Sequence, residues 1–310
     1  MLGGLSAPLT AALLFTGLLL DALLGEPRRL HPLVGFGRIA LRVEGLLNRG
    51  RWRRVAGALA WALAVLPPVC LVLWLQRLLP AWASWLLDAA LLWFSLGLFS
   101  LRAHTAPIAA ALSAGNLADA RALTARIVSR DTGHAGEAEL AKAACESQLE
   151  NGSDAVIGAL FWFALAGGAG ALLFRLANTL DAMWGYRNAR FGRFGSFAAR
   201  ADDVLGYLPA RLTALAYALL GDTRRALACW RTQAPAWPSP NAGPVMSSGA
   251  GALGVALGGT ARYDGVDEMR PSLGEGRAPK AADIARAWRL VACSALMWCT
   301  LFALAALLTG

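Results

Sequence analysis

Two polar stretches lie inside an otherwise apolar chain: RIVSRDTGHAGEAELAKAACESQLENGSDAV at residues 126–156, and NTLDAMWGYRNARFGRFGSFAARADDVLGYLPAR at residues 178–211. Together they hold nine of the chain's 20 acidic residues. Ionisable groups next to apolar segments are costly to keep near a membrane, so they usually line a cavity or a site. We therefore predict that the polar region 126–211 contains the active site.

The composition around this region is that of a membrane protein. Of 310 residues, 57% are hydrophobic and only 16% are charged, and the mean hydropathy is +0.48. These values are too apolar for an ordinary soluble domain. The net charge of +9 comes almost wholly from arginine, which we interpret as cytoplasmic loops that obey the positive-inside rule rather than as a nucleic-acid surface. We expect no nucleic-acid partner.

The apolar runs predict an all-α, polytopic helical membrane protein with substantial cytoplasmic loops. We predict membrane spans near 5–25, 55–79, 81–101 and 287–309, because these apolar runs are long enough to cross a bilayer. Two further runs, 155–177 and 203–221, are expected to be buried in protein or re-entrant, because spanning would place an arginine-rich loop outside. No internal repeat is evident, so we treat 1–310 as one integral membrane domain.

The segments between the spans carry more specific expectations. Arginines concentrate in 26–54, which predicts a cytoplasmic loop, as do 102–155 and 222–286. Asn116 is placed to cap a helix, and the glycines at 167, 168 and 170 favour close helix packing or a break. Residues 222–285 are rich in Gly and Pro and predict an irregular loop with one short helix. The five cysteines show no metal spacing and are expected to be small buried hydrophobes.

One helical face allows two interpretations. Glu139, Lys142, Glu146, Glu150 and Asp154 follow one another at spacings of three or four, which places them on the same side of a helix. Such a face is often only a solvated set of paired charges. The alternative is that this face lines the site.

The chemistry of the two stretches points to phosphate. Clustered carboxylates and amides suit Mg²⁺, which keeps several waters and is commonly shared with substrate phosphates. Arginines suit phosphate oxygens through paired hydrogen bonds. Phosphoryl or nucleotide chemistry follows as the expected class, and no Ser-His-Asp arrangement competes with it.

Ordered sequence blocks resemble a known family. The blocks are LDALLGEPRRLHPLVGFGRIA, SRDT, ESQLENGSDAV, LFWFALAGGAGALLFRLANTLDAMWGYRN, FGSFAARADDVLGYLPARLTAL, SPNAG, GALGVALGG and RYDG, over roughly residues 17–290. In this order they resemble the CobD/CbiB family, adenosylcobinamide-phosphate synthase of cobalamin biosynthesis. The resemblance implies ATP-dependent joining of adenosylcobyric acid to (R)-1-amino-2-propanol O-phosphate, or to aminopropanol, which gives adenosylcobinamide phosphate.

The same blocks imply the functional residues. We expect four catalytic residues: Asp131, Glu146, Glu150 and Asp181. We expect the substrates and ATP to be bound by Arg130, Thr132, Asn151, Asn178, Thr179, Tyr186, Arg187, Asn188 and Arg211. We expect Mg²⁺ to be held by Asp154, Asp202 and Asp203.

The resemblance also implies a setting. We expect a multi-pass protein of the bacterial cytoplasmic membrane, with its active site facing the cytoplasm. Expected partners are adenosylcobyric acid, aminopropanol phosphate, the lipid bilayer and other late enzymes of the corrinoid pathway. A transporter is disfavoured because the acids concentrate in two blocks and no two halves resemble each other. A non-catalytic membrane scaffold or sensor of the same family is the alternative that we retain.

Overall fold

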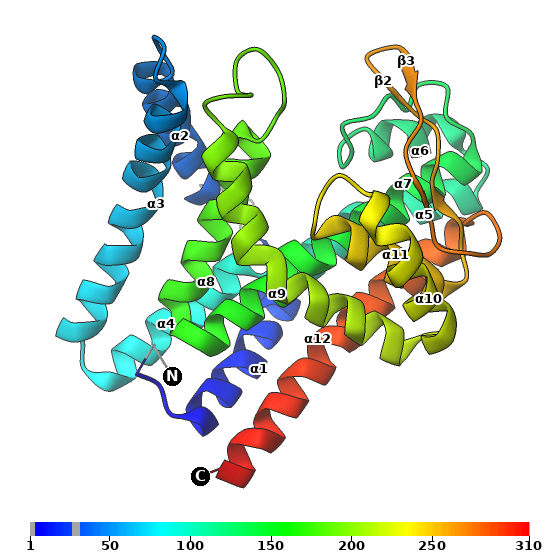
Figure 1. The fold of residues 1–310 in the computed structure, drawn as a ribbon. Helices are drawn as coiled ribbons and strands as arrows, with labels where there is room; N and C mark the ends of the chain where they lie inside the picture. The colour runs from blue at the N-terminus through cyan, green and yellow to red at the C-terminus, as the bar shows by residue number, and fades with distance from the viewer. Residues whose placement is uncertain (1–3, 27–31, 310) are drawn as a thin grey trace. The chain divides into compact units, whose positions relative to one another are not determined.

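The computed structural model describes residues 4–26 and 32–309, so Arg28 and Arg29 of the predicted loop 26–54 lie outside the described residues. Five helices among the described residues are long and apolar enough to cross a membrane. They are Ala7–Leu24, Arg53–Leu78, Ala81–Ser113, Glu137–Trp184 and Ala281–Leu308. The predicted all-α, polytopic membrane fold is confirmed (Figure 1).

The chain forms two compact units. Unit 1 comprises Met1–Leu96, Gly158–Gly206 and Cys299–Gly310, and unit 2 comprises Gly97–Ile157 and Tyr207–Trp298. That the two units make one membrane domain stays a prediction.

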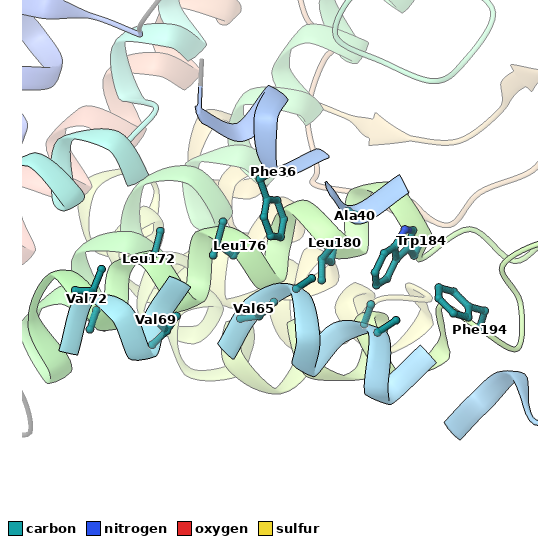
Figure 2. Close-up of a cluster of buried hydrophobic side chains, with 14 residues drawn as sticks. Phe36, Ala40, Val65, Val69, Val72, Leu172, Leu176, Leu180, Trp184 and Phe194 are labelled. Carbon is teal, nitrogen blue, oxygen red and sulfur yellow. The ribbon is translucent and has the colours of Figure 1, made fainter. Parts of the chain in front are cut away.

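Helices build unit 1 around an apolar core. They are α1 (Ala7–Leu24), α2 (Pro32–Leu47), α3 (Arg53–Leu78), α4 (Ala81–Ser95), α8 (Gly158–Trp184), the start of α9 (Ser196–Leu220) and the end of α12 (Ala281–Thr309). In α2 the buried residues Phe36, Ala40 and Glu44 recur every fourth position, which turns one face of this helix toward α3 and α8. Trp184 and Phe194 meet edge to face at one end of this core (Figure 2).

The backbone of α8 is broken inside unit 1. Ala166 and Gly167 leave helical geometry, and Gly167 has a φ of +65°, which glycine adopts without strain. The buried carboxylate of Asp88 on α4 accepts hydrogen bonds at Oδ1 from the Gly168 N–H (2.7 Å) and from Gln76 Nε2 (2.8 Å). Asp88 therefore satisfies a donor that the break would otherwise leave unpaired. The break expected from the glycine cluster is confirmed.

Unit 2 is helical with a small amount of sheet. It contains α5 (Leu98–Ser113), α6 (Leu117–Thr124), α7 (Glu137–Gly152), a π-helical turn η1 (Ser153–Ile157), the rest of α9 and of α12, α10 (Thr223–Gln233), a 3₁₀ turn η2 (Ala234–Ala236) and α11 (Ala242–Leu253). The strands β1 (Leu257–Gly258) and β4 (Ser272–Leu273) pair antiparallel, as do β2 (Ala261–Tyr263) and β3 (Val266–Glu268), which form a hairpin (Figure 1).

Several local expectations are settled. Asn116 caps α6, because its Oδ1 accepts from the Asp119 N–H at 3.1 Å. The expectation of one short helix in 222–285 is wrong, because α10 and α11 both form there beside the four strands. Hydropathy misses α10 because its sequence TRRALACWRTQ is polar; Asp222 starts it by accepting from the Arg225 N–H. The cysteine expectation holds for Cys145, Cys229 and Cys299, whereas Cys70 and Cys293 are exposed.

Candidate functional site

The site in unit 2 is built on α7. This helix begins after Gly136, whose N–H donates to Oε2 of Glu139 at 2.7 Å and so completes the first turn. Two turns further on, Glu146 is directed into the protein and only 2% of its surface is exposed. A buried carboxylate requires compensating charge and hydrogen bonds.

Two arginines and one backbone N–H supply that compensation. Arg130 forms an ion pair with Oε2 of Glu146. Arg270 donates from Nη1 to Oε2 at 3.1 Å and from Nη2 to Oε1 at 3.2 Å, and the Gly258 N–H donates to Oε1 at 2.7 Å. We call Arg130, Glu146 and Arg270 the arginine clamp.

The arginine clamp leaves one positive charge in excess. Both oxygens of Glu146 are occupied by donors, so in this arrangement its carboxylate positions the arginines rather than accepting a proton. Guanidinium groups that are fixed in this way are preorganised to bind phosphate or carboxylate oxygens. Trp237 lies beside the clamp, with its ring centroid 5.7 Å from Cζ of Arg270.

A pocket of about 250 Å³ opens beside the clamp, and we call it the Glu150 pocket. Glu150 and Asn151 lie one turn beyond Glu146 on α7, and Nδ2 of Asn151 donates to the Ser147 carbonyl at 2.8 Å. Acidic and basic groups thus border the same space. The pocket is lined by Ile127, Val128, Ser129, Arg130, Glu146, Ser147, Glu150, Asn151, Trp237, Met246, Tyr263 and Arg270.

Asp131 and Thr132 are held next to Arg130. The backbone N–H of Asp131 donates to the Arg262 carbonyl at 2.8 Å, and its Oδ2 accepts from the Gly265 N–H at 2.7 Å. Asp131 thereby fixes the β2–β3 hairpin. Thr132 is buried and donates from Oγ1 to the Arg121 carbonyl at 3.0 Å.

Asp154 and Arg211 complete the predicted residues of unit 2. Asp154 lies in η1, near the buried Tyr217, whose hydroxyl donates to the Leu149 carbonyl at 3.0 Å. Burial, and after it the charge of Asp154, raises the pKa of Tyr217, so this phenol stays protonated. Arg211 donates to Oδ1 of Asn241 at 2.8 Å.

The remaining predicted residues belong to unit 1, where three carboxylates gather. Asp181 lies on α8, and Asp202 and Asp203 lie on α9. Burial, followed by the charge of Asp181, raises the pKa of Asp202 to about 7, while a hydrogen bond from Asn178 Nδ2 to Asp202 Oδ1 (3.2 Å) opposes that rise. Burial also raises the pKa of Asp203, against the effect of the Arg187 guanidinium.

The other three predicted residues of unit 1 have simpler surroundings. Thr179 donates to the Arg175 carbonyl at 2.8 Å within its own helix. Asn188 accepts at Oδ1 from the backbone N–H groups of Arg190 (3.0 Å) and Phe191 (2.9 Å), which fixes a turn. Tyr186 is 55% exposed.

The three carboxylates of unit 1 fit Mg²⁺ in one respect. Their mutual repulsion would be relieved by a cation, and Mg²⁺ prefers oxygen ligands. Across residues 4–26 and 32–309, however, no group of three or more His, Cys, Asp or Glu side chains converges into a complete metal site. An ion held here would therefore draw its other ligands from water and substrate phosphate, as Mg²⁺ often does.

The raised pKa of Asp202 predicts a stability effect. An ordinary aspartate has a pKa of 3.8, against about 7 for Asp202 in the fold, so the folded chain binds the proton more tightly and loses stability as the pH rises from about 4 to 7. We expect Asp202→Asn to be more stable than the parent at pH 8 and to match it at pH 4. Thermal midpoints in detergent at both pH values test this. A variant that is less stable than the parent at pH 8 would contradict it.

Sequence reasoning missed several residues of the unit 2 site. Arg270, Gly258, Trp237 and Tyr263 lie more than 80 residues beyond α7 in the chain, so no local spacing connects them with Glu146. The only available signal was the pair of blocks GALGVALGG and RYDG, which contain Gly258 and Tyr263. Arg270 and Trp237 lie outside every block.

These features define a multi-pass helical membrane protein with a buried arginine–carboxylate site. A family model described as CobD/CbiB protein matches residues 14–291. The chain is 60% identical over 283 residues to "Cobalamin biosynthesis protein CobD" of Stutzerimonas stutzeri. The aligned region covers 91% of this chain and 93% of that protein. The chain belongs to the CobD/CbiB family.

Two further relatives bear the same name. The protein of Chromobacterium violaceum is 53% identical over 308 residues, which is 97% of this chain and 98% of the relative. The protein of Mycobacterium tuberculosis is 42% identical over 278 residues, with coverage of 87% and 88%. No solved structure matches this chain.

Proposed function

We propose that this protein acts in cobalamin biosynthesis as an ATP-dependent ligase that forms an amide bond. It joins the propionate carboxylate of adenosylcobyric acid to (R)-1-amino-2-propanol O-phosphate, or to aminopropanol, and the product is adenosylcobinamide phosphate. Family membership supports the pathway. The observation that carries the reaction type is the arginine clamp, which borders a pocket together with Glu150.

The proposed reaction proceeds in two steps. A carboxylate oxygen attacks the γ-phosphorus of ATP, which forms an acyl phosphate and releases ADP. The amine nitrogen then attacks the acyl carbon, inorganic phosphate leaves, and one proton is lost from nitrogen. Arg130 and Arg270 stabilise the negative charge that builds up on phosphate and acyl oxygens, and Glu150 accepts the amine proton.

Mg²⁺ would offset charge on the phosphate oxygens, and the residues suited to hold it are Asp202 and Asp203, with Asp154 as the remaining candidate. If one of the adjacent aspartates holds the ion, both Asp202→Asn and Asp203→Asn lower turnover. We expect one of them also to raise the Mg²⁺ concentration that gives half-maximal rate. Titration of Mg²⁺ against initial rate tests this, and two active variants with the parent's Mg²⁺ dependence would remove the metal role from this pair.

The reaction itself is tested with purified protein in detergent. Adenosylcobyric acid, aminopropanol phosphate, ATP and Mg²⁺ are supplied, and adenosylcobinamide phosphate and ADP are measured by chromatography. Equal amounts of the two products are expected. Corrinoid binding without product, under conditions in which a relative of established activity turns over, would favour the non-catalytic scaffold or sensor.

We further propose that the protein lies in the bacterial cytoplasmic membrane with residues 26–54, 102–155 and 222–286 on the cytoplasmic side. In a background without the five cysteines, single cysteines replace the exposed residues Arg49, Ala118 and Ser272. An impermeant thiol reagent added to intact cells should leave all three unlabelled and label them after the membrane is opened. Labelling of any one in intact cells would contradict the orientation.

A further inference from the structure

A second pocket, of about 230 Å³, adjoins the arginine clamp, and we call it the Lys142 pocket. Arg130 lines both this pocket and the Glu150 pocket. Glu139 and Lys142 face the Lys142 pocket, whereas Ser147 and Glu150 face the Glu150 pocket. The two pockets therefore border successive turns of α7 and share Arg130 as a lining residue.

The ammonium group of Lys142 has hydrogen-bond donors that the protein does not use. An ammonium group can donate three hydrogen bonds. The structure gives Lys142 one long bond, from Nζ to the Thr260 carbonyl at 3.4 Å, and within the described part of the chain no carboxylate pairs with it. Lys142 is half-buried at the pocket wall, near the charges of Glu139 and Glu146 but not in contact with them.

The carboxylates of the Lys142 pocket are already engaged. Asp131 accepts from the Gly265 N–H, Glu139 accepts from the Gly136 N–H, and Asp267 forms an ion pair with Arg262. The pocket lining carries three carboxylates and three cations, and the ammonium of Lys142 and the guanidinium of Arg130 are the cations not paired with a carboxylate of this pocket. The pocket therefore offers cationic hydrogen-bond donors to phosphate oxygens, while its carboxylates already accept hydrogen bonds.

We propose that the Lys142 pocket binds the phosphate chain of the nucleoside triphosphate, with Lys142 and Arg130 as its two cations. A flexible lysine is a common phosphate ligand that acts as a point charge, and Arg130 adds directional donors. Phosphate in this pocket lies next to the guanidinium that also borders the Glu150 pocket. The identity of the ligand as a nucleotide rests on the proposed function, whereas the phosphate chemistry rests on the pocket alone.

The chain offers an unusually direct test, because Lys142 and Lys280 are its only lysines and Lys280 is exposed. The purified full-length protein in detergent is treated with trinitrobenzenesulfonate, and modification at each lysine is followed by peptide mass spectrometry. We expect ATP and inorganic tripolyphosphate to slow modification of Lys142 several-fold and to leave Lys280 unchanged. Unchanged modification of Lys142 at saturating concentrations of all phosphate compounds would overturn the proposal.

Further measurements show which phosphate compound the pocket binds, and they test this inference independently of the proposed ligase reaction. Protection by aminopropanol phosphate but not by ATP or tripolyphosphate would overturn the assignment to the nucleotide. In Lys142→Met we expect weaker ATP binding with a nearly unchanged KM for the amine, whereas Lys142→Arg restores much of the binding and Lys280→Met has no effect. Protection does not require turnover, so it can succeed where amide formation fails. Amide formation by a protein whose Lys142 is never protected would overturn this inference alone.

Discussion

Glu146→Gln is expected to abolish amide formation and to destabilise the protein. The substitution removes the one buried carboxylate that compensates two partly buried guanidinium groups, Arg130 and Arg270. Breaking a buried ion pair by removing one partner costs about 3–5 kcal/mol, because the other charge is left uncompensated. Thermal midpoints in detergent and turnover measure the two effects.

The matched control is Glu137→Gln, an exposed glutamate in the first turn of the same helix α7. It removes the same charge but lies outside both pockets, so the midpoint and the turnover should stay close to those of the parent. A Glu146→Gln variant with the parent's midpoint would show that the clamp does not stabilise the folded chain.

Glu150→Gln is expected to lose activity while it keeps the fold. Glu150 borders its pocket one turn beyond Glu146 and is less buried, so the amide can replace the carboxylate without disrupting the clamp. General base catalysis contributes about 10²–10⁴-fold, which is the expected fall in kcat. Turnover is measured beside the thermal midpoint, with Glu137→Gln again as the control. Near-normal turnover would show that Glu150 is a solvated charge on the helix face and takes no part in the reaction.

The contrast between the two variants separates positioning from chemistry. Loss of midpoint and turnover in Glu146→Gln, with loss of turnover alone in Glu150→Gln, matches one residue that holds arginines and one that handles a proton. If both variants lost the midpoint equally, the Glu150 side chain would also be structural.

Local pattern was sufficient for much of the fold. A run such as 55–79 is long and apolar, so its length alone predicts α3. Asn116 caps α6 through a side chain that acts three residues away, which a short window captures. The polar helix α10 shows the limit of that approach, because hydropathy does not predict a helix that lacks an apolar run.

The face of α7 was only half predictable. Spacing correctly grouped Glu146 and Glu150, which border the same pocket. The predicted pairing among Glu139, Lys142 and Glu146 does not form within the described ranges, because Glu139 binds the Gly136 N–H and Glu146 binds the two arginines. Glu139 is exposed, as the solvated-face alternative expects, whereas Glu146 is buried. Spacing cannot identify partners such as Arg270, because tertiary packing brings that residue to the helix.

The arginine clamp also has a consequence for synthesis of the protein on the ribosome. Glu146 and Arg270 are separated by 124 positions, and Gly258 follows Glu146 by 112. At about 5–20 residues per second, a ribosome needs roughly 6–25 s to add the 124 residues between Glu146 and Arg270. Throughout that interval the nascent α7 carries a carboxylate that lacks one of its two cationic partners. Chains that end before Arg270 should therefore be preferred substrates of membrane quality-control proteases.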